Sequence, residues 1–175
     1  RGPVLQLLIL HAIAALVAPV LVGWIGRRAF LVLAAVPASA AAWAALNTGA
    51  ALSGEPPSQT VLWVGGLGMH LQFRLDALSW LMTLIVGGIG ALVLVYSAAY
   101  FAKGASALGR FAAVFLAFAG AMLGLVTADN TLLLYVFWEL TTISSYVLIG
   151  HYHERQASRR AASQAIMVTT LGGLA

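Results

Sequence analysis

Long apolar runs alternate along the chain with short polar or glycine-rich segments. Five runs, at residues 4–25, 29–48, 77–101, 111–128 and 129–150, are each long enough to cross the roughly 30 Å core of a bilayer as a helix, at about 1.5 Å per residue. A sixth, more polar run begins at residue 158. The pattern predicts an all-α polytopic membrane protein with five complete transmembrane helices and the start of a sixth.

One segment departs from this pattern. Residues 61–75 contain two short β-type runs, VLWV and LQFRL, joined by a glycine-rich stretch at 65–68. The second run alternates apolar and polar positions, which is typical of a strand with one buried face. We expect a loop at 49–60 and then a small β-hairpin on the membrane face, with His70 as one of its solvated residues.

The chain therefore divides into three parts. Residues 1–48 form two N-terminal transmembrane helices, residues 49–75 form an external loop and hairpin, and residues 76–175 form transmembrane helices three to six. Asp76 is placed to cap the third helix, and one of residues 129–131 to cap the fifth.

Composition supports a membrane protein and excludes several other classes. The chain is 62% hydrophobic and 8% charged, with a mean hydropathy of +0.96, and its apolar runs are too long for barrel strands. It has no cysteine, which excludes disulfides, iron–sulfur clusters and thiolate metal sites within these residues. The sequence contains neither a phosphate-binding glycine loop nor a nucleophile–base pair, so no motif indicates an enzyme. We expect no cofactor and no nucleic-acid partner.

The basic residues predict the orientation in the membrane. Seven of the nine Lys and Arg residues lie in alternate connections between runs: Arg27, Arg28, Lys103, Arg110, Arg155, Arg159 and Arg160. Cytoplasmic loops are enriched in Lys and Arg. We therefore expect these connections in the cytoplasm, and the N-terminus and hairpin outside.

The fifth run, DNTLLLYVFWELTTISSYVLIG, carries one carboxylate near its middle, Glu139. An ionisable group near the bilayer midplane is costly and usually functional. Helical spacing places Tyr135, Thr142 and Tyr146 on the face of Glu139. We expect this hydroxyl stripe to face other helices or a hydrated cavity, because unpaired polar groups in lipid are unfavourable.

Glu139 has two interpretations. It is either a protonated, hydrogen-bonded packing residue or a group that changes its protonation or ion partner during transport, and we favour the second. His11, in the first run, is a candidate proton relay, but its place near one end of the run favours an interfacial or structural role. His151 and His153 lack a third ligand, which favours a solvated loop over a metal site.

The residues from 129 onward carry a family resemblance. DNTLLLYVFWELTTISSYVLIGHY and the following RRAASQAIMVTTLGGLA closely resemble the large A subunit of Mrp-type multisubunit cation/proton antiporters. FRLDALSWLMTLIVGGIGALVLVYSAAYF fits the same family, so the resemblance covers about residues 70–175. The same superfamily includes the antiporter-like subunits of respiratory complex I and of membrane-bound hydrogenases.

The resemblance implies a fold and a function. The family fold contains two inverted five-helix repeats, so this chain, which starts without Met, is expected to be the N-terminal part of a longer subunit. Glu139 matches the family's helix-five glutamate, which pairs with a helix-seven lysine and modulates a central proton-carrying lysine, both beyond Ala175 in this numbering. Other Mrp subunits, the lipid bilayer of a prokaryotic cell membrane, and Na⁺ and H⁺ as transported ions are the implied partners.

Two alternatives remain open. In the first, the chain belongs to an antiporter-like, proton-pumping subunit of a redox-driven complex, of the complex I or membrane-bound hydrogenase type. In the second, it is a structural membrane scaffold and Glu139 is a packing residue.

Overall fold

The computed structural model describes residues 2–67, 69–102, 107–150 and 156–174. Its elements, in chain order, are α1 (Val4–Ile25), the 3-10 turn η1 (Gly26–Arg28), α2 (Ala29–Leu33), α3 (Ala35–Leu46), α4 (Thr48–Leu52), β1 (Ser58–Val64), η2 (Gly65–Leu67), β2 (Met69–Arg74), α5 (Ala77–Tyr100), α6 (Leu108–Thr127), α7 (Thr131–Ile149) and α8 (Gln156–Leu174).

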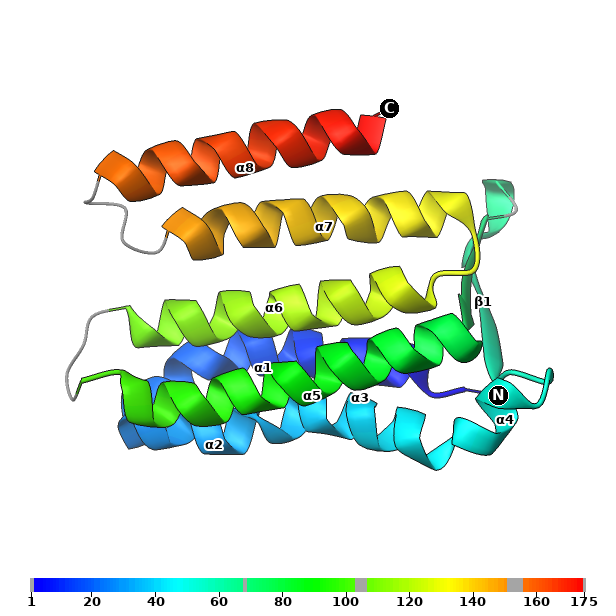
Figure 1. Cartoon of the computed structure of the whole chain (residues 1–175), viewed down its shortest axis with the longest axis horizontal. Coiled ribbons are helices and arrows are strands. Elements are labelled where there is room, and N and C mark those ends of the chain that lie inside the picture. The colour runs from blue at the N-terminus through cyan, green and yellow to red at the C-terminus, as the bar shows by residue number, and fades with distance from the viewer. Residues whose placement is uncertain (1, 68, 103–106, 151–155, 175) are drawn as a thin grey trace.

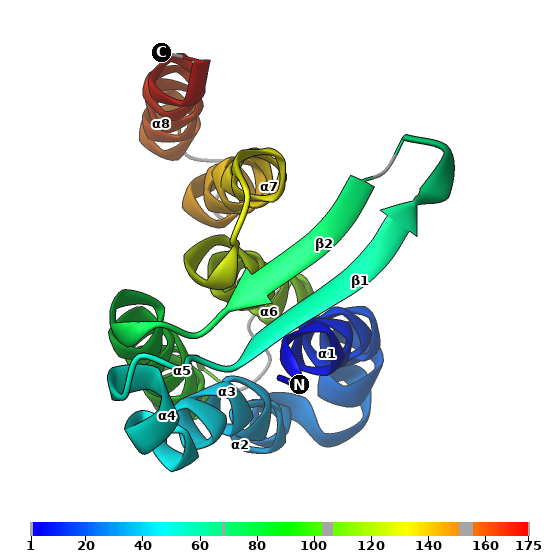
Figure 2. The ribbon, with the colours of Figure 1, turned by 90° about the vertical axis from the view of Figure 1, so that its right-hand side faces the viewer.

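The long helices lie side by side along the longest axis of the molecule (Figure 1). Helix α6 packs against both α1 and α7, α3 packs against α5, and α8 packs against α7. Seen from the hairpin end, α6 lies between α1 and α7, and α8 lies on the side of α7 away from α6 (Figure 2). The bundle therefore brings α1 next to α6, although they are far apart in the sequence, and leaves α7 between α6 and α8.

Four described segments are long and apolar enough to cross a membrane: Val4–Leu46, Ala77–Tyr100, Leu108–Thr127 and Thr131–Ile149. The first of them reverses direction at η1, so that α1 and the α2–α3 pair run beside each other (Figure 1). The predicted all-helical, multi-pass architecture with a small hairpin is therefore confirmed. Helix α8 is not among these segments, in agreement with the more polar sequence of the sixth run.

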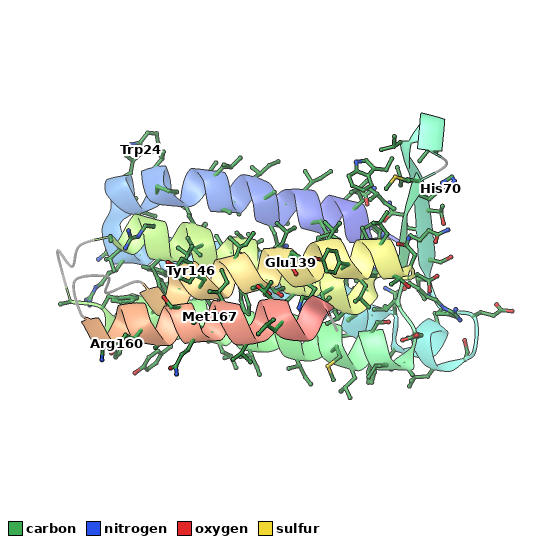
Figure 3. All side chains as sticks on the ribbon, turned by 90° about the horizontal axis from the view of Figure 1, so that it is seen from above. Trp24, His70, Glu139, Tyr146, Arg160 and Met167 are labelled. Carbon is green, nitrogen blue, oxygen red and sulfur yellow. The ribbon has the colours of Figure 1, made fainter. Side chains whose placement is uncertain are left out.

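The two ends of the bundle differ in charge and structure. The turn η1, the end of α5 with the start of α6, and the end of α7 with the start of α8 lie at one end, and the β-hairpin lies at the other (Figure 1). Arg27 and Arg28 form part of η1, and Arg160 lies near the same end, opposite His70 (Figure 3). The described basic residues of the predicted connections thus share one end of the bundle, as the spacing of the runs predicts: Arg27, Arg28, Arg110 and Arg160.

The hairpin is an antiparallel pair with Ser58 opposite Arg74 and an irregularity between Leu62 and Val64. Backbone hydrogen bonds join the hairpin to the residues that precede α7 and α1. Asp129 N donates to Gln72 O at 2.9 Å, and Gly2 N donates to Ser58 O at 3.2 Å. The side chain of Phe73, in β2, is fully buried. The hairpin therefore closes that end of the bundle and fixes where α7 begins.

Some details differ from the sequence-based expectations. The predicted loop at 49–60 contains the short helix α4, and β1 begins three residues before residue 61. The second run is divided at Ala34 into α2 and α3. This break lies one turn before Pro37, and proline has no backbone N–H to donate to a carbonyl of the preceding turn. Helix α8 begins two residues earlier than expected, while His151 and His153 lie outside the described residues.

Candidate functional site

Helix α7 presents the candidate carboxylate. The side chain of Asn130 accepts a hydrogen bond from Leu133 N at 2.8 Å, so Asn130 is the residue among 129–131 that caps the helix. Glu139 follows Thr131 by eight residues, which places it about 12 Å along the helix axis. It lies midway along the bundle, away from both ends (Figure 3).

Glu139 lies at the contact between α7 and α8. The residue is half-buried, but its Oε1 is fully buried and has no hydrogen-bond partner among the described residues. A Cβ built on Gly173 of α8 would lie 3.5 Å from this oxygen. The backbone of α8 therefore passes close to the carboxylate without offering it a donor.

Trp138, which precedes the glutamate, makes the closest approach to α8. Its Nε1 donates a hydrogen bond to Thr169 O at 3.4 Å, and a Cβ on Gly173 would lie only 2.6 Å from the same nitrogen. Gly173 is thus required for this approach. Gly173 was missed in the sequence, because spacing within one helix does not identify contacts on another.

The three hydroxyls predicted to accompany Glu139 share its helical face but differ in environment. Thr142 is buried, and its Oγ1 donates to Trp138 O at 3.1 Å. Tyr135 and Tyr146 are 39% and 41% exposed. Thr142 is therefore buried, as expected for a residue that faces other helices. The described residues do not bury Tyr135 and Tyr146. A cooperative role with Glu139 stays a prediction for all three.

His11 lies on the other side of the bundle, in the contact between α1 and α6. It is only 2% exposed, its Nδ1 lies 2.8 Å from Leu7 O, and a Cβ on Gly120 would lie 2.8 Å from His11 Cβ. Of the interfacial and structural roles expected for His11, its burial under α6 fits the structural one, and the proton-relay role stays a prediction. Glu139 faces α8 instead, so the two candidate residues lie at different helix contacts.

Comparison with known proteins identifies the family. Residues 62–112 match the family described as NADH-ubiquinone oxidoreductase (complex I), chain 5 N-terminus, and residues 128–175 match NADH:quinone oxidoreductase/Mrp antiporter, TM. The A1 subunit of the Na(+)/H(+) antiporter of Staphylococcus aureus (strain JH9) is 44% identical over 123 residues, which are 70% of this chain and 15% of that protein. The structure of the Mrp complex from Dietzia sp. DQ12-45-1b contains a chain that is 34% identical and superposes with a TM-score of 0.84 over 99% of this chain.

The chain belongs to the antiporter-like family of the large A subunit of Mrp complexes. It spans 15% of the length of the Staphylococcus aureus protein and 18% of the matching chain in the Mrp complex. A chain of the membrane-bound sulfane sulfur reductase, an archaeal respiratory membrane complex, has the same fold, with a TM-score of 0.74 and 18% identity.

Within this Mrp-type chain, the described residues contain no group of three or more His, Cys, Asp or Glu side chains that could hold a metal ion. Glu139 itself has neither a cation nor a hydrogen-bond donor on Oε1 in the described part of the chain. What the arrangement offers chemically is one carboxylate, held at mid-depth, that can take a proton or a positively charged partner.

Proposed function

We propose that the chain is part of a subunit of a multisubunit Mrp-type Na⁺/H⁺ antiporter, in which Glu139 takes part in ion or proton translocation. The observation that carries the proposal is the buried, unpartnered Oε1 of Glu139 midway along a membrane-spanning helix. A charged carboxylate without a partner is very unfavourable in an apolar environment. Glu139 must therefore hold a proton or meet a cation that lies outside the described residues.

A group with two such states suits proton-coupled transport. When Glu139 pairs with a positively charged side chain, such as the family's helix-seven lysine, both charges are stabilised and the proton leaves. When the pair separates, the carboxylate takes up a proton and the released lysine alters the proton affinity of its next neighbour. By alternating between these two states, a carboxylate–lysine pair in the membrane can alter the protonation of a neighbouring group in the bilayer plane.

The relatives support the remaining parts of the proposal. One is named as a subunit of a Na(+)/H(+) antiporter and another belongs to a solved Mrp complex. We infer that the chain acts in a secondary transporter rather than an enzyme, assembled with other Mrp subunits in a prokaryotic cell membrane. Its hairpin would face outward and its basic connections the cytoplasm, since Lys and Arg are enriched on the cytoplasmic side.

A second candidate is an antiporter-like subunit of a redox-driven pump. It is favoured by the match of residues 62–112 to a complex I family. The sulfane sulfur reductase, at 18% identity, shares the fold alone. Iron–sulfur or quinone-binding subunits that co-purify with the chain would favour this candidate, and a complex without them would favour the antiporter.

The test is sodium-dependent proton flux in vesicles that contain the whole complex, with Glu139→Gln compared with wild type. Glutamine keeps the shape and removes the charge. A fitting control is Thr83→Val on α5, because Thr83 Oγ1 is the other buried polar atom without a partner among the described residues. We expect flux to fall at least tenfold in Glu139→Gln and to stay near wild type in Thr83→Val.

Assembly must be checked in each variant. Near-normal flux through an assembled Glu139→Gln complex would contradict the role of Glu139. Loss of assembly in Glu139→Gln, with normal flux per assembled complex, would favour the scaffold interpretation, in which Glu139 is a packing residue.

A further inference from the structure

An apolar groove runs along the bundle on the side away from α8. Helix α6 forms its floor, α1 and α7 form its walls, and strand β2 closes its outer end with Leu71 and Phe73. Its volume is about 390 Å³. Figure 2 shows α6 between α1 and α7, with the hairpin crossing this end of the bundle in front of α6.

His11 is the titratable side chain that lines this groove. Its Nδ1 lies 2.8 Å from the carbonyl oxygen of Leu7, and a carbonyl only accepts hydrogen bonds, so Nδ1 carries the proton. In the neutral ring Nε2 is then an acceptor. Nε2 makes no hydrogen bond with the described residues, although His11 as a whole is only 2% exposed.

Neither lipid nor water completes this site. A lipid acyl chain has no donor to offer Nε2, and an unsatisfied polar group in hydrocarbon is unfavourable by several kcal/mol. A stable buried water needs two or more polar partners. The other polar side chain on the groove, Ser144, lies about 20 Å from the hairpin end of α7, whereas His11 lies about 10 Å from that of α1, too far apart for one water to bridge.

We propose that the groove is the docking site for a membrane-spanning helix of another subunit, which brings a side-chain hydrogen-bond donor to Nε2 of His11. Small residues on the groove surface, Ala12, Ala117 and Ala121, allow a helix to approach closely, as in other helix contacts in lipid. Leu71 and Phe73 of the hairpin place an apolar stop above its outer end. Hydroxyl, amide and indole side chains are the donors that remain neutral in such a place.

The position of α8 favours another subunit over a later helix of the same chain. Helix α8 packs on α7 from the side opposite α6 and α1, so it covers the Glu139 face and leaves the groove open (Figure 2). The proposal rests on the assembly with other subunits inferred above, but not on transport by Glu139.

The test is photo-crosslinking in the purified whole complex. A photoreactive phenylalanine analogue replaces Ala12 or Ala117, both exposed on the groove, and replaces Leu92 of α5, which is 68% exposed, as a control outside the groove. We expect both groove positions to crosslink to one spanning segment of another subunit, and that segment to carry a Ser, Thr, Asn, Gln, Tyr or Trp. Leu92 should not crosslink to that segment.

Substitution of His11 supplies a second readout. His11→Leu removes the acceptor, whereas His11→Gln keeps an acceptor at a similar reach. We expect His11→Leu to lower the crosslinking yield from Ala117 about threefold to tenfold, the range that one hydrogen bond between helices in a membrane provides, and His11→Gln to retain most of it.

Three results would overturn the docking site: crosslinks to lipid alone, crosslinks to the same polypeptide, or an equal yield in His11→Leu and wild type. Crosslinking does not require transport, so loss of the Glu139 hypothesis would leave it unaffected. A chain that purifies without any other subunit would instead contradict the proposed assembly.

Discussion

At Gly173 the absence of a side chain lets α8 lie against the indole of Trp138. A Cβ there would lie 2.6 Å from Trp138 Nε1 and 2.9 Å from Cδ1, closer than real contacts allow. The neighbouring Gly172 has nothing within 4 Å of the same position. One glycine therefore sets the distance between α8 and the Glu139 region, and the other does not.

This contrast gives a matched pair of variants. Both Gly173→Ala and Gly172→Ala gain about 0.5–1 kcal/mol of helix propensity, but overpacking at Gly173 costs about 1–3 kcal/mol. We expect Gly173→Ala to lower thermal stability and to reduce sodium-dependent proton flux severalfold, with a changed pH profile. Gly172→Ala should match or exceed the stability of wild type. Equal behaviour of the two variants in both assays would show that the α7–α8 contact does not control the site.

At the scale of an element, Asp76 determines where α5 begins. Its Oδ1 accepts hydrogen bonds from Ser79 N at 2.9 Å and from Ser79 Oγ at 2.8 Å. The backbone N–H of Ser79 is the main cause that lowers the pKa of Asp76 below its usual value, aided by the Ser79 hydroxyl and opposed by partial burial. The carboxylate is thus more stable in the folded chain than in the unfolded one.

The cap predicts a pH dependence with a defined sign. A lowered folded-state pKa stabilises the fold above the ordinary carboxyl pKa of about 3.9, and this contribution disappears as the pH falls through the lowered value. We expect Asp76→Ala to lose about 1 kcal/mol at neutral pH. Asp76→Asn keeps the acceptor without the charge, so its deficit against wild type should vanish in acid. Thermal unfolding from pH 7 to pH 3 measures this, and a deficit that stays constant would contradict it.

The elements that could be predicted from the sequence are those whose signals are local. Continuous hydropathy identified the spans, alternation in LQFRL identified β2, and Asp76 was recognisable as a cap. For α7 the sequence limited the cap to residues 129–131, which include the observed cap Asn130. Contacts between helices could not be predicted, because the spacing within α7 contains no information about α8. The burial of His11 by Gly120, and the approach of Gly173 to Trp138, both depend on which helices become neighbours.

For a related reason, the sequence left the interfacial and structural roles of His11 undecided. Its place near one end of α1 is compatible with an interface in an isolated helix. In the bundle α6 covers this part of α1, so the side chain is buried. Tyr135 and Tyr146 lie on the helical face that was predicted, but the described residues leave their side chains 39% and 41% exposed.

At the scale of the whole molecule, the separation of charge between the two ends predicts the orientation in the membrane. Arg27, Arg28 and Arg160 lie at one end, and the hairpin, with the exposed Glu55 before it, lies at the other. These 175 residues contain no cysteine, so a single introduced cysteine reports on its own position without background from this part of the subunit. Thr60 on the hairpin and Ala102 after α5 are both exposed and lie at opposite ends.

We expect a membrane-impermeant maleimide to label Thr60→Cys in intact cells, because the end with fewer basic residues faces outward. Ala102→Cys should react only after the membrane is made permeable. The two variants control for each other, since each introduces one exposed thiol and differs only in the side of the membrane. Labelling of Ala102→Cys alone in intact cells would indicate the opposite orientation. Labelling of both variants would mean that α5, the helix between the two positions, does not cross the membrane. The expected pattern would place the start of α7 toward the outside, with Glu139 about 12 Å inward from that end.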